Sequence, residues 1–109
     1  MSQRVAKVES LIQQVVAAGL NEYLEGDAAS VTVTRVDAAP DLRNATIWIG
    51  LLGKEVAQER LWRRIENLRG ELQRATSSKL TMKYVPHLHL RRDTGGAYAA
   101  EIEHLLKNL

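Results

Sequence analysis

Two stretches in which apolar and polar residues alternate flank a short turn-forming segment in the first half of the chain. Residues 30–38 read SVTVTRVDA and residues 45–52 read ATIWIGLL; alternation of this kind, with β-branched side chains, is typical of strands that bury one face. Proline cannot donate to a sheet ladder, and Asp or Asn can close a local bend. The segment between the strands carries Pro40, Asp41 and Asn44. The pattern predicts a β-hairpin, and on its buried face we expect Val31, Val33, Ile47, Ile49 and Leu51.

Helical periodicity precedes and follows this hairpin. Residues 4–24 carry apolar side chains at spacings of three and four, which predicts one helix with one buried stripe. That stripe comprises Val5, Val8, Ile12, Val15, Val16, Leu20, Tyr23 and Leu24. Residues 55–77 hold a second stripe, made of Ala57, Leu61, Ile65, Leu68, Leu72 and Ala75. Gly70 lies within the second stripe, where glycine costs about 1 kcal/mol relative to alanine, so a kink or a close packing contact is expected there.

The last regular pattern has a period of two and covers residues 80–91, which we predict to be a strand. One side carries Leu80, Met82, Tyr84, Pro86, Leu88 and Leu90, and the other carries Thr81, Lys83, Val85, His87, His89 and Arg91. A proline inside such a run indicates an edge strand or a bulge at Pro86. After the Gly95–Gly96 pair, the apolar residues Tyr98, Ile102, Leu105 and Leu106 predict a short C-terminal helix. The order of elements predicts an α+β fold with helices covering one face of a sheet.

Composition limits the class of protein. The 109 residues fit a single domain, so we expect residues 1–109 to fold as one unit. Because the chain has no cysteine, disulfides and thiolate chemistry are excluded. The longest apolar run, residues 47–52, is far too short to span a bilayer. The N-terminal sequence MSQRVAKVES carries charge where a signal peptide needs an apolar core. We therefore expect a cytoplasmic protein that does not associate with membranes.

The charges of the second helix have two interpretations. Projected at about 100° per residue, one group clusters beside the apolar stripe: Arg60, Arg63, Arg64, Asn67 and Arg74. Arg69 and Trp62 lie on the opposite flank. This face is either an ordinary solvated helix surface, partly neutralised by neighbouring glutamates, or a surface that contacts phosphates. Arginine suits the second role because its rigid fork of donors matches phosphate oxygens.

No pattern in the chain favours catalysis. His87 and His89 share one strand face and could bind a metal, but no third ligand stands near them in the sequence. His104 is isolated. The serines have no Gly-x-Ser-x-Gly context, and there is no glycine-rich phosphate loop. With no phenylalanine and few aromatic residues, the chain also lacks the stacking platform of an RRM-like RNA reader.

Several stretches, taken together and in order, resemble the bacterial ribosome-binding factor A family. VTVTRVDAAPDL, followed by NATIWIGLLG, resembles the family's first hairpin, where a V-x-V-S-P-D-L-like segment precedes A-x-V-x-V-S. KYVPHL (residues 83–88) resembles the family's R-Y-x-P-x-L strand. Asp93 and the segment 102–106, IEHLL, resemble its closing D-x-S and I-x-x-L-L elements. The resemblance runs nearly from end to end.

Two positions depart from the family pattern. The family tends to have an Ala-x-Gly kink between two helices in place of the Gly-x-x-Gly loop of KH domains. This kink corresponds to Leu68-Arg69-Gly70, so the glycine is retained while leucine replaces alanine. Gly95 stands where the family commonly has serine. With the glycine in the apolar stripe, the resemblance predicts a break between two helical segments at Gly70.

The resemblance implies a type II KH-like domain: a helix, a hairpin, a kinked helix pair and a strand, with a three-stranded sheet and helices on one face. It also implies a monomeric, non-enzymatic RNA-binding factor with no cofactor, metal or small-molecule substrate. Its partners would be the immature small (30S) ribosomal subunit and 16S rRNA, whose late maturation and 5′-end processing it would promote. The expected RNA-facing residues are Arg60, Arg63, Arg64, Arg69, Gly70, Arg74, Lys79 and Lys83. The Pro-Asp-Leu turn would then have a mainly structural role.

The alternative is a protein-interaction or dimerisation domain that does not bind RNA. It would use the sheet edge near Pro86 together with an exposed Trp48 or Trp62. A tight homodimer without measurable affinity for RNA would favour this alternative.

Overall fold

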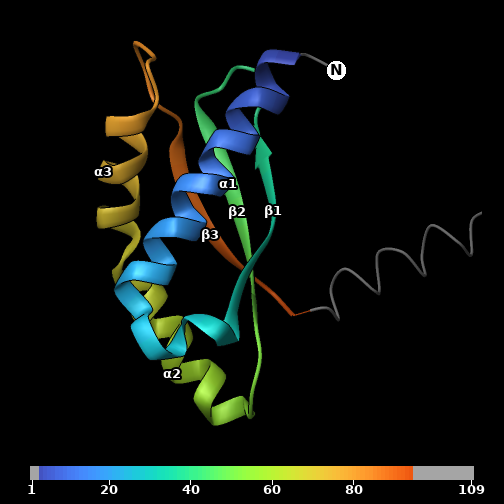
Figure 1. Ribbon diagram of the computed structural model, residues 1–109. Coiled ribbons are helices and arrows are strands. Elements are labelled where there is room, and N and C mark those ends of the chain that lie inside the picture. Colours follow the sequence, from blue (N-terminus) through green and yellow to red (C-terminus); the bar gives the residue numbers. More distant parts are fainter. Residues whose placement is uncertain (1–2, 95–109) are drawn as a thin grey trace, which may run out of the picture.

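The computed structural model describes residues 3–94, which form a three-stranded sheet with the helices on one of its faces (Figure 1). In chain order the elements are α1 (Gln3–Leu24), the 3₁₀ helix η1 (Glu25–Ser30), β1 (Val31–Ala38), β2 (Asn44–Leu51), α2 (Glu55–Asn67), α3 (Arg69–Lys79) and β3 (His87–Asp93). The predicted order of helix, hairpin, broken helix and strand is confirmed. The C-terminal helix expected after Gly95, like His104, lies outside the described residues. No helix within residues 3–94 is long and apolar enough to cross a membrane.

The sheet has the order β1-β2-β3, with β1 antiparallel and β3 parallel to the central strand β2. The hairpin has the predicted register, because Val33 pairs with Ile49 and Ile49 is fully buried. A shift in register between Val33 and Arg35 then turns Val36 into the core, where it is 7% exposed. Such a bulge adds one residue to a strand and reverses the alternation beyond it.

The prediction that β3 begins at Leu80 is wrong, since the strand begins at His87. His87 pairs with Asn44, which is the first residue of β2. Within residues 3–94, the residues before His87 therefore have no neighbouring strand with which to pair, and Pro86 has no N–H to donate to a ladder. Leu80 is nevertheless buried, whereas Tyr84, expected on the same side, is 74% exposed. The edge position predicted for this strand is confirmed.

The core lies between the sheet and the helices. Most of the stripe predicted on α1 is confirmed, with Ile12 and Val16 fully buried, but Tyr23 is 40% exposed and lies outside the core. No role in packing was predicted for Gly19. A Cβ atom at Gly19 would stand 2.8 Å from Cδ2 of Leu72, a buried residue of α3. The glycine therefore permits α1 and α3 to approach each other closely.

The predicted helix over residues 55–77 is broken, but the break lies at Leu68 rather than at Gly70. Leu68 has φ −89° and ψ −2°, and its N–H donates to the carbonyl of Ile65 at 2.9 Å, which interrupts the α-helical ladder. The chain changes direction there (Figure 1). This turn allows Ile65 of α2 and Leu72 of α3 both to be fully buried. Gly70 is the second residue of α3.

Candidate nucleic-acid interface

The eight residues predicted to face RNA do not form one continuous cluster. The break at Leu68 divides them between two helices, and the last one lies in the loop that leads to β3. The residues on α2 are Arg60, Arg63 and Arg64; those on α3 are Arg69, Gly70, Arg74 and Lys79; Lys83 is in the loop. In Figure 1, α2 and this loop lie at opposite ends of the fold.

The outer face of α2 carries the most accessible arginines. Arg60 and Arg63, one helical turn apart, are exposed and line a shallow hollow with Asn67. Within residues 3–94, neither guanidinium has a hydrogen-bond or ion-pair partner. Arg64, by contrast, donates from Nη1 to Oδ2 of Asp27 at 2.7 Å. Arg60 and Arg63 are thus available to an anionic ligand.

Glu59 is adjacent to these arginines, but its carboxylate is engaged elsewhere. It forms an ion pair with Arg92 of β3, which also donates from Nη2 to Oε1 of Gln58 at 2.8 Å. An acid that already has a cationic partner compensates a neighbouring arginine less. Arg92 was not identified in the sequence, because nothing local connects it to residues more than 30 positions earlier.

The residues around the helix break have a different character. Arg69 is partly buried, and its Nη1 lies 3.5 Å from the carbonyl oxygen of Leu88 in β3. Arg74 forms an exposed ion pair with Glu71 at 3.1 Å. A Cβ atom at Gly70 would meet nothing closer than the guanidinium of Arg74, at 3.5 Å. Within residues 3–94, nothing therefore requires glycine at this position.

Gln73 of α3 binds the free edge of β3 with both ends of its side-chain amide. Its Oε1 accepts the N–H of Leu88 at 2.8 Å, and its Nε2 donates to the carbonyl of Pro86 at 2.9 Å. The amide thereby makes the hydrogen bonds to the backbone at this edge that a further strand would make. Sequence reasoning missed this contact, since a single glutamine on a helix carries no sign of its partners.

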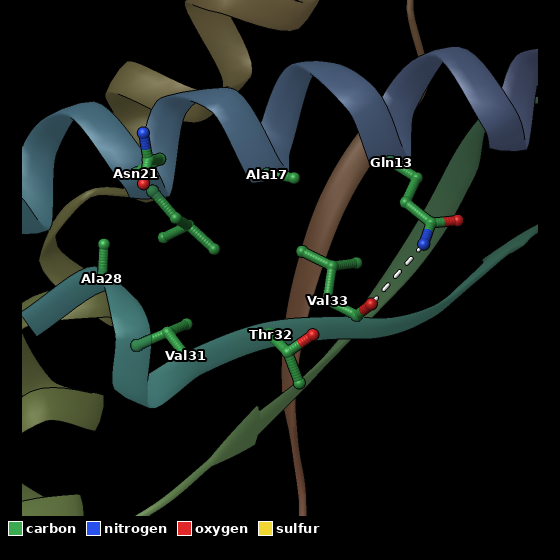
Figure 2. A pocket seen from close by; sticks show the side chains of 8 residues that line it. Gln13, Ala17, Asn21, Ala28, Val31, Thr32 and Val33 are labelled. Atoms are coloured by element: carbon green, nitrogen blue, oxygen red, sulfur yellow. Dashed lines mark hydrogen bonds between the residues drawn. The ribbon is translucent and has the colours of Figure 1, made fainter.

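Two side chains of α1 bond to backbone groups along the free edge of β1. Glu9 accepts the N–H of Ala38 through Oε2 at 2.9 Å, and Gln13 donates from Nε2 to the carbonyl of Val33 at 3.5 Å. Figure 2 shows Gln13 reaching from α1 toward Val33 across a hollow between the helix and the strand. An edge strand invites pairing with another chain through its unpaired backbone groups. Side chains occupy backbone groups at both edges of this sheet.

The two tryptophans proposed for the alternative function are not freely exposed. Trp48, on the face of the sheet opposite the helices α1–α3, is partly buried and donates from Nε1 to Oδ2 of Asp37 at 3.2 Å. The guanidinium of Arg35 lies over its ring, 5.2 Å from the centroid. Trp62 is also partly buried and packs against the core. Neither tryptophan offers an open apolar patch for a partner protein.

His87 and His89 lie side by side on the face of the sheet opposite the helices α1–α3, as the alternation predicted. Their ring centroids are 4.8 Å apart, and Nε2 of His89 lies 2.8 Å from Oδ1 of Asn44. Among residues 3–94 no group of three or more potential ligands is placed to hold a metal ion.

Lys79 and Lys83 lie apart from the exposed arginines of α2, Arg60 and Arg63. Lys79 is the exposed last residue of α3, and Lys83 follows in the loop before β3. Lys83 places its Nζ 5.5 Å from the ring centroid of Tyr84. Both residues of this pair line a hollow of about 740 Å³ at that end of the fold.

Comparisons with known proteins place this geometry in context. A family model described as ribosome-binding factor A matches residues 4–106. The ribosome-binding factor A of Gemmatimonas aurantiaca is 31% identical over 108 residues, covering 97% of this chain and 74% of that protein. An NMR structure of a Thermotoga maritima protein shares the fold with a TM-score of 0.70 at 22% identity, covering 87% of this chain and 92% of the other.

A third comparison concerns a protein placed in a complex. Coordinates of the Thermus thermophilus ribosome-binding factor A, a homology model fitted into a cryo-EM map of its complex with 30S, match with a TM-score of 0.61 at 16% identity. The match covers 78% of this chain and 90% of the other. These structural matches confirm the predicted KH-like fold.

Proposed function

The chain belongs to the ribosome-binding factor A family, and we propose that it is an RNA-binding assembly factor of the small ribosomal subunit. In this role it associates with the immature 30S subunit in the cytoplasm and promotes late maturation and 5′-end processing of 16S rRNA, without catalysing a reaction itself. The Thermus thermophilus relative in complex with 30S supports the choice of partner. Side chains that occupy the backbone of both sheet edges support a monomer.

The observation that carries the proposal is that Arg60 and Arg63 are exposed and unpaired within residues 3–94. Both guanidinium groups are exposed on one side of α2, and the neighbouring Glu59 is paired with Arg92. Arginine that is neither buried nor paired within residues 3–94 retains its full set of donors for phosphate oxygens. Contacts of this kind set the position of a protein on RNA without reading its sequence.

Phosphate contacts also make the affinity depend on salt. Each phosphate that is neutralised releases condensed counterions, so the logarithm of the binding constant falls by roughly 0.7–0.9 per phosphate for each unit of log salt concentration. If Arg60 and Arg63 each contact one phosphate, replacing both should reduce the slope by about 1.5.

The test is co-sedimentation of the double variant Arg60→Glu/Arg63→Glu with purified small subunits over a series of salt concentrations. We expect weaker binding and a shallower salt slope, with an unchanged unfolding transition because exposed charges contribute little to folding. The matched control is Lys7→Glu/Arg91→Glu, which changes the net charge equally at two exposed sites away from α2. Equal binding of the wild type and the α2 variant at all salt concentrations would show that Arg60 and Arg63 do not contact the subunit.

A further inference from the structure

A second basic hollow lies at the opposite end of the fold from α2, where the β1–β2 turn meets the loop before β3. We propose that this hollow binds one unpaired nucleotide of RNA, with the base stacked on Tyr84 and its phosphates held by Lys83 and Arg43. The hollow has a volume of about 740 Å³, and its wall includes Pro40 and Asp41 of the turn and Arg4 at the start of α1. The inference rests on the proposed RNA-binding role but concerns a separate site.

The turn that forms one wall is held in a fixed conformation. Leu42 has a φ of 59°, which is unfavourable for leucine, yet its side chain is only 8% exposed. Its N–H donates to the carbonyl of Ala39 at 2.8 Å, and the N–H of Ala39 donates to the carbonyl of Asn44 at 2.8 Å. Unfavourable backbone conformations persist where the surroundings hold them, and they cluster at ligand sites. With Leu42 pointing inward, the flanking Asp41 and Arg43 are both exposed.

The opposite wall, formed by residues 82–85 of the loop before β3, is linked to this turn by a backbone hydrogen bond. The N–H of His87 donates to the carbonyl of Arg43 at 2.9 Å, which joins the end of the loop to the turn. Just before this contact, Tyr84 is 74% exposed although it is a large aromatic residue. The partly buried Met82 and Val85 on either side of it pack against the core. The loop is therefore anchored by its neighbours while the tyrosine ring faces outward.

The chemistry of this hollow fits a nucleotide. Aromatic rings stack on RNA bases irrespective of base identity, because every base has a π-face. The ammonium of Lys83 now lies over the Tyr84 ring, but the attraction of a cation for an exposed ring is weaker than stacking of a base on it. A base can therefore displace the lysine, whose charge is then free to bind the adjacent phosphate.

The charge of the lining is also suited to an anion. Among residues 3–94, the hollow is lined by three basic residues, Arg4, Arg43 and Lys83, and by one acidic residue, Asp41. The carboxylate of Asp41 already accepts the backbone N–H of Arg43 through Oδ1 at 3.1 Å. A partner of acidic peptide character would use the same charges but would have no need for the aromatic ring, so we favour RNA.

The test uses fluorescence anisotropy of a labelled hexauridylate and a labelled hexaadenylate with the full-length protein. Tyr84→Ala should lower the affinity roughly fivefold to a hundredfold, as expected for loss of one stacked base. Tyr84→Phe keeps the ring and should bind within about twofold of the wild type. Lys83→Gln should make the dependence of log affinity on log salt concentration shallower by roughly 0.7–0.9, which is the contribution of one phosphate contact. Because Tyr84 and Lys83 are exposed, circular dichroism should show all variants to be folded.

Two outcomes would overturn the inference: the wild type fails to bind both oligonucleotides, or Tyr84→Ala binds them as the wild type does. If, in the second case, Tyr84→Ala also binds small subunits less tightly than the wild type, the hollow belongs to a protein partner. Sedimentation of the wild type with small subunits distinguishes these failures from failure of the proposed function, since it does not depend on Tyr84 alone.

Discussion

The two helices on either side of Leu68 are both rich in arginine, yet they use their polar side chains in opposite ways. On α3, Arg69 and Gln73 bond to the backbone of β3. On α2, Arg60 and Arg63 face solvent. The difference arises from position, since α3 packs along the free edge of the sheet, where backbone groups need partners. An arginine near such an edge becomes part of the fold, whereas one turned away from it is available to a ligand.

This comparison divides the predicted RNA surface into an anchored part and an accessible part. Arg69 has a structural contact that accounts for its position, and Arg74 is paired with Glu71 on its own helix. The accessible charge is concentrated on α2 and, at the other end of the molecule, around Tyr84. We therefore expect variants of the bonded side chains of α3, Arg69 and Gln73, to act mainly on stability and variants of the exposed arginines of α2 mainly on binding.

The largest effect is expected from Leu72→Ala, which removes the residue that joins α3 to α1. Leu72 is fully buried and packs against Gly19, so the truncation should lower the free energy of unfolding by about 2–5 kcal/mol. Val56→Ala on α2 is the matched control; since Val56 is 73% exposed, its effect should stay within about 0.5 kcal/mol. Urea unfolding followed by circular dichroism measures both. Similar losses for the two variants would mean that Leu72 is not buried between α3 and α1.

A smaller loss is expected from Gln73→Ala. The variant leaves the N–H of Leu88 and the carbonyl of Pro86 without their side-chain partner, which should cost about 1–3 kcal/mol. Gln73→Glu keeps the acceptor for Leu88 and loses only the donor to Pro86, so its loss should be intermediate. Amide hydrogen exchange gives a local measure, because exchange at Leu88 should accelerate in Gln73→Ala and much less in Gln73→Glu. Unchanged exchange at Leu88 would show that Gln73 does not hold this edge.

The parts of the fold that the sequence predicted are those that local patterns determine. Alternation identified the hairpin, and Ile47 and Ile49 are fully buried as expected. The start of β3 could not be found in this way, because the pattern continues back to Leu80 while the paired strand β2 begins at Asn44, opposite His87. The length of a strand depends on its neighbour as well as on its own residues. The need for glycine at position 19 likewise depends on Leu72, which is far away in the sequence.

The candidate site was only partly predictable for a similar reason. Helical spacing correctly grouped Arg60 with Arg63, since both lie on α2 on one side of the break. It could not reveal that Arg64 is paired with Asp27 of η1, nor that Arg69 approaches Leu88. Projection of one continuous helix also placed Arg74 on the same face, and the turn at Leu68 separates it. Charge patterns identify candidates, but the tertiary contacts decide which of them remain accessible.

The smallest effect on stability, and one of opposite sign, is expected from Gly70→Ala. Gly70 has no left-handed backbone conformation, and an added Cβ would meet only the exposed guanidinium of Arg74. Alanine should therefore raise the free energy of unfolding by about 0.4–1 kcal/mol by restricting the unfolded chain. A glycine that the fold does not need is explained if the RNA backbone approaches α3 closely at this position, so we expect affinity for small subunits to fall severalfold. Ser77→Ala, at an exposed site further along the same helix, is the control and should leave binding unchanged. If Gly70→Ala gains stability and binds subunits as the wild type does, RNA does not approach the start of α3 closely, and the interface does not extend from α2 to Gly70.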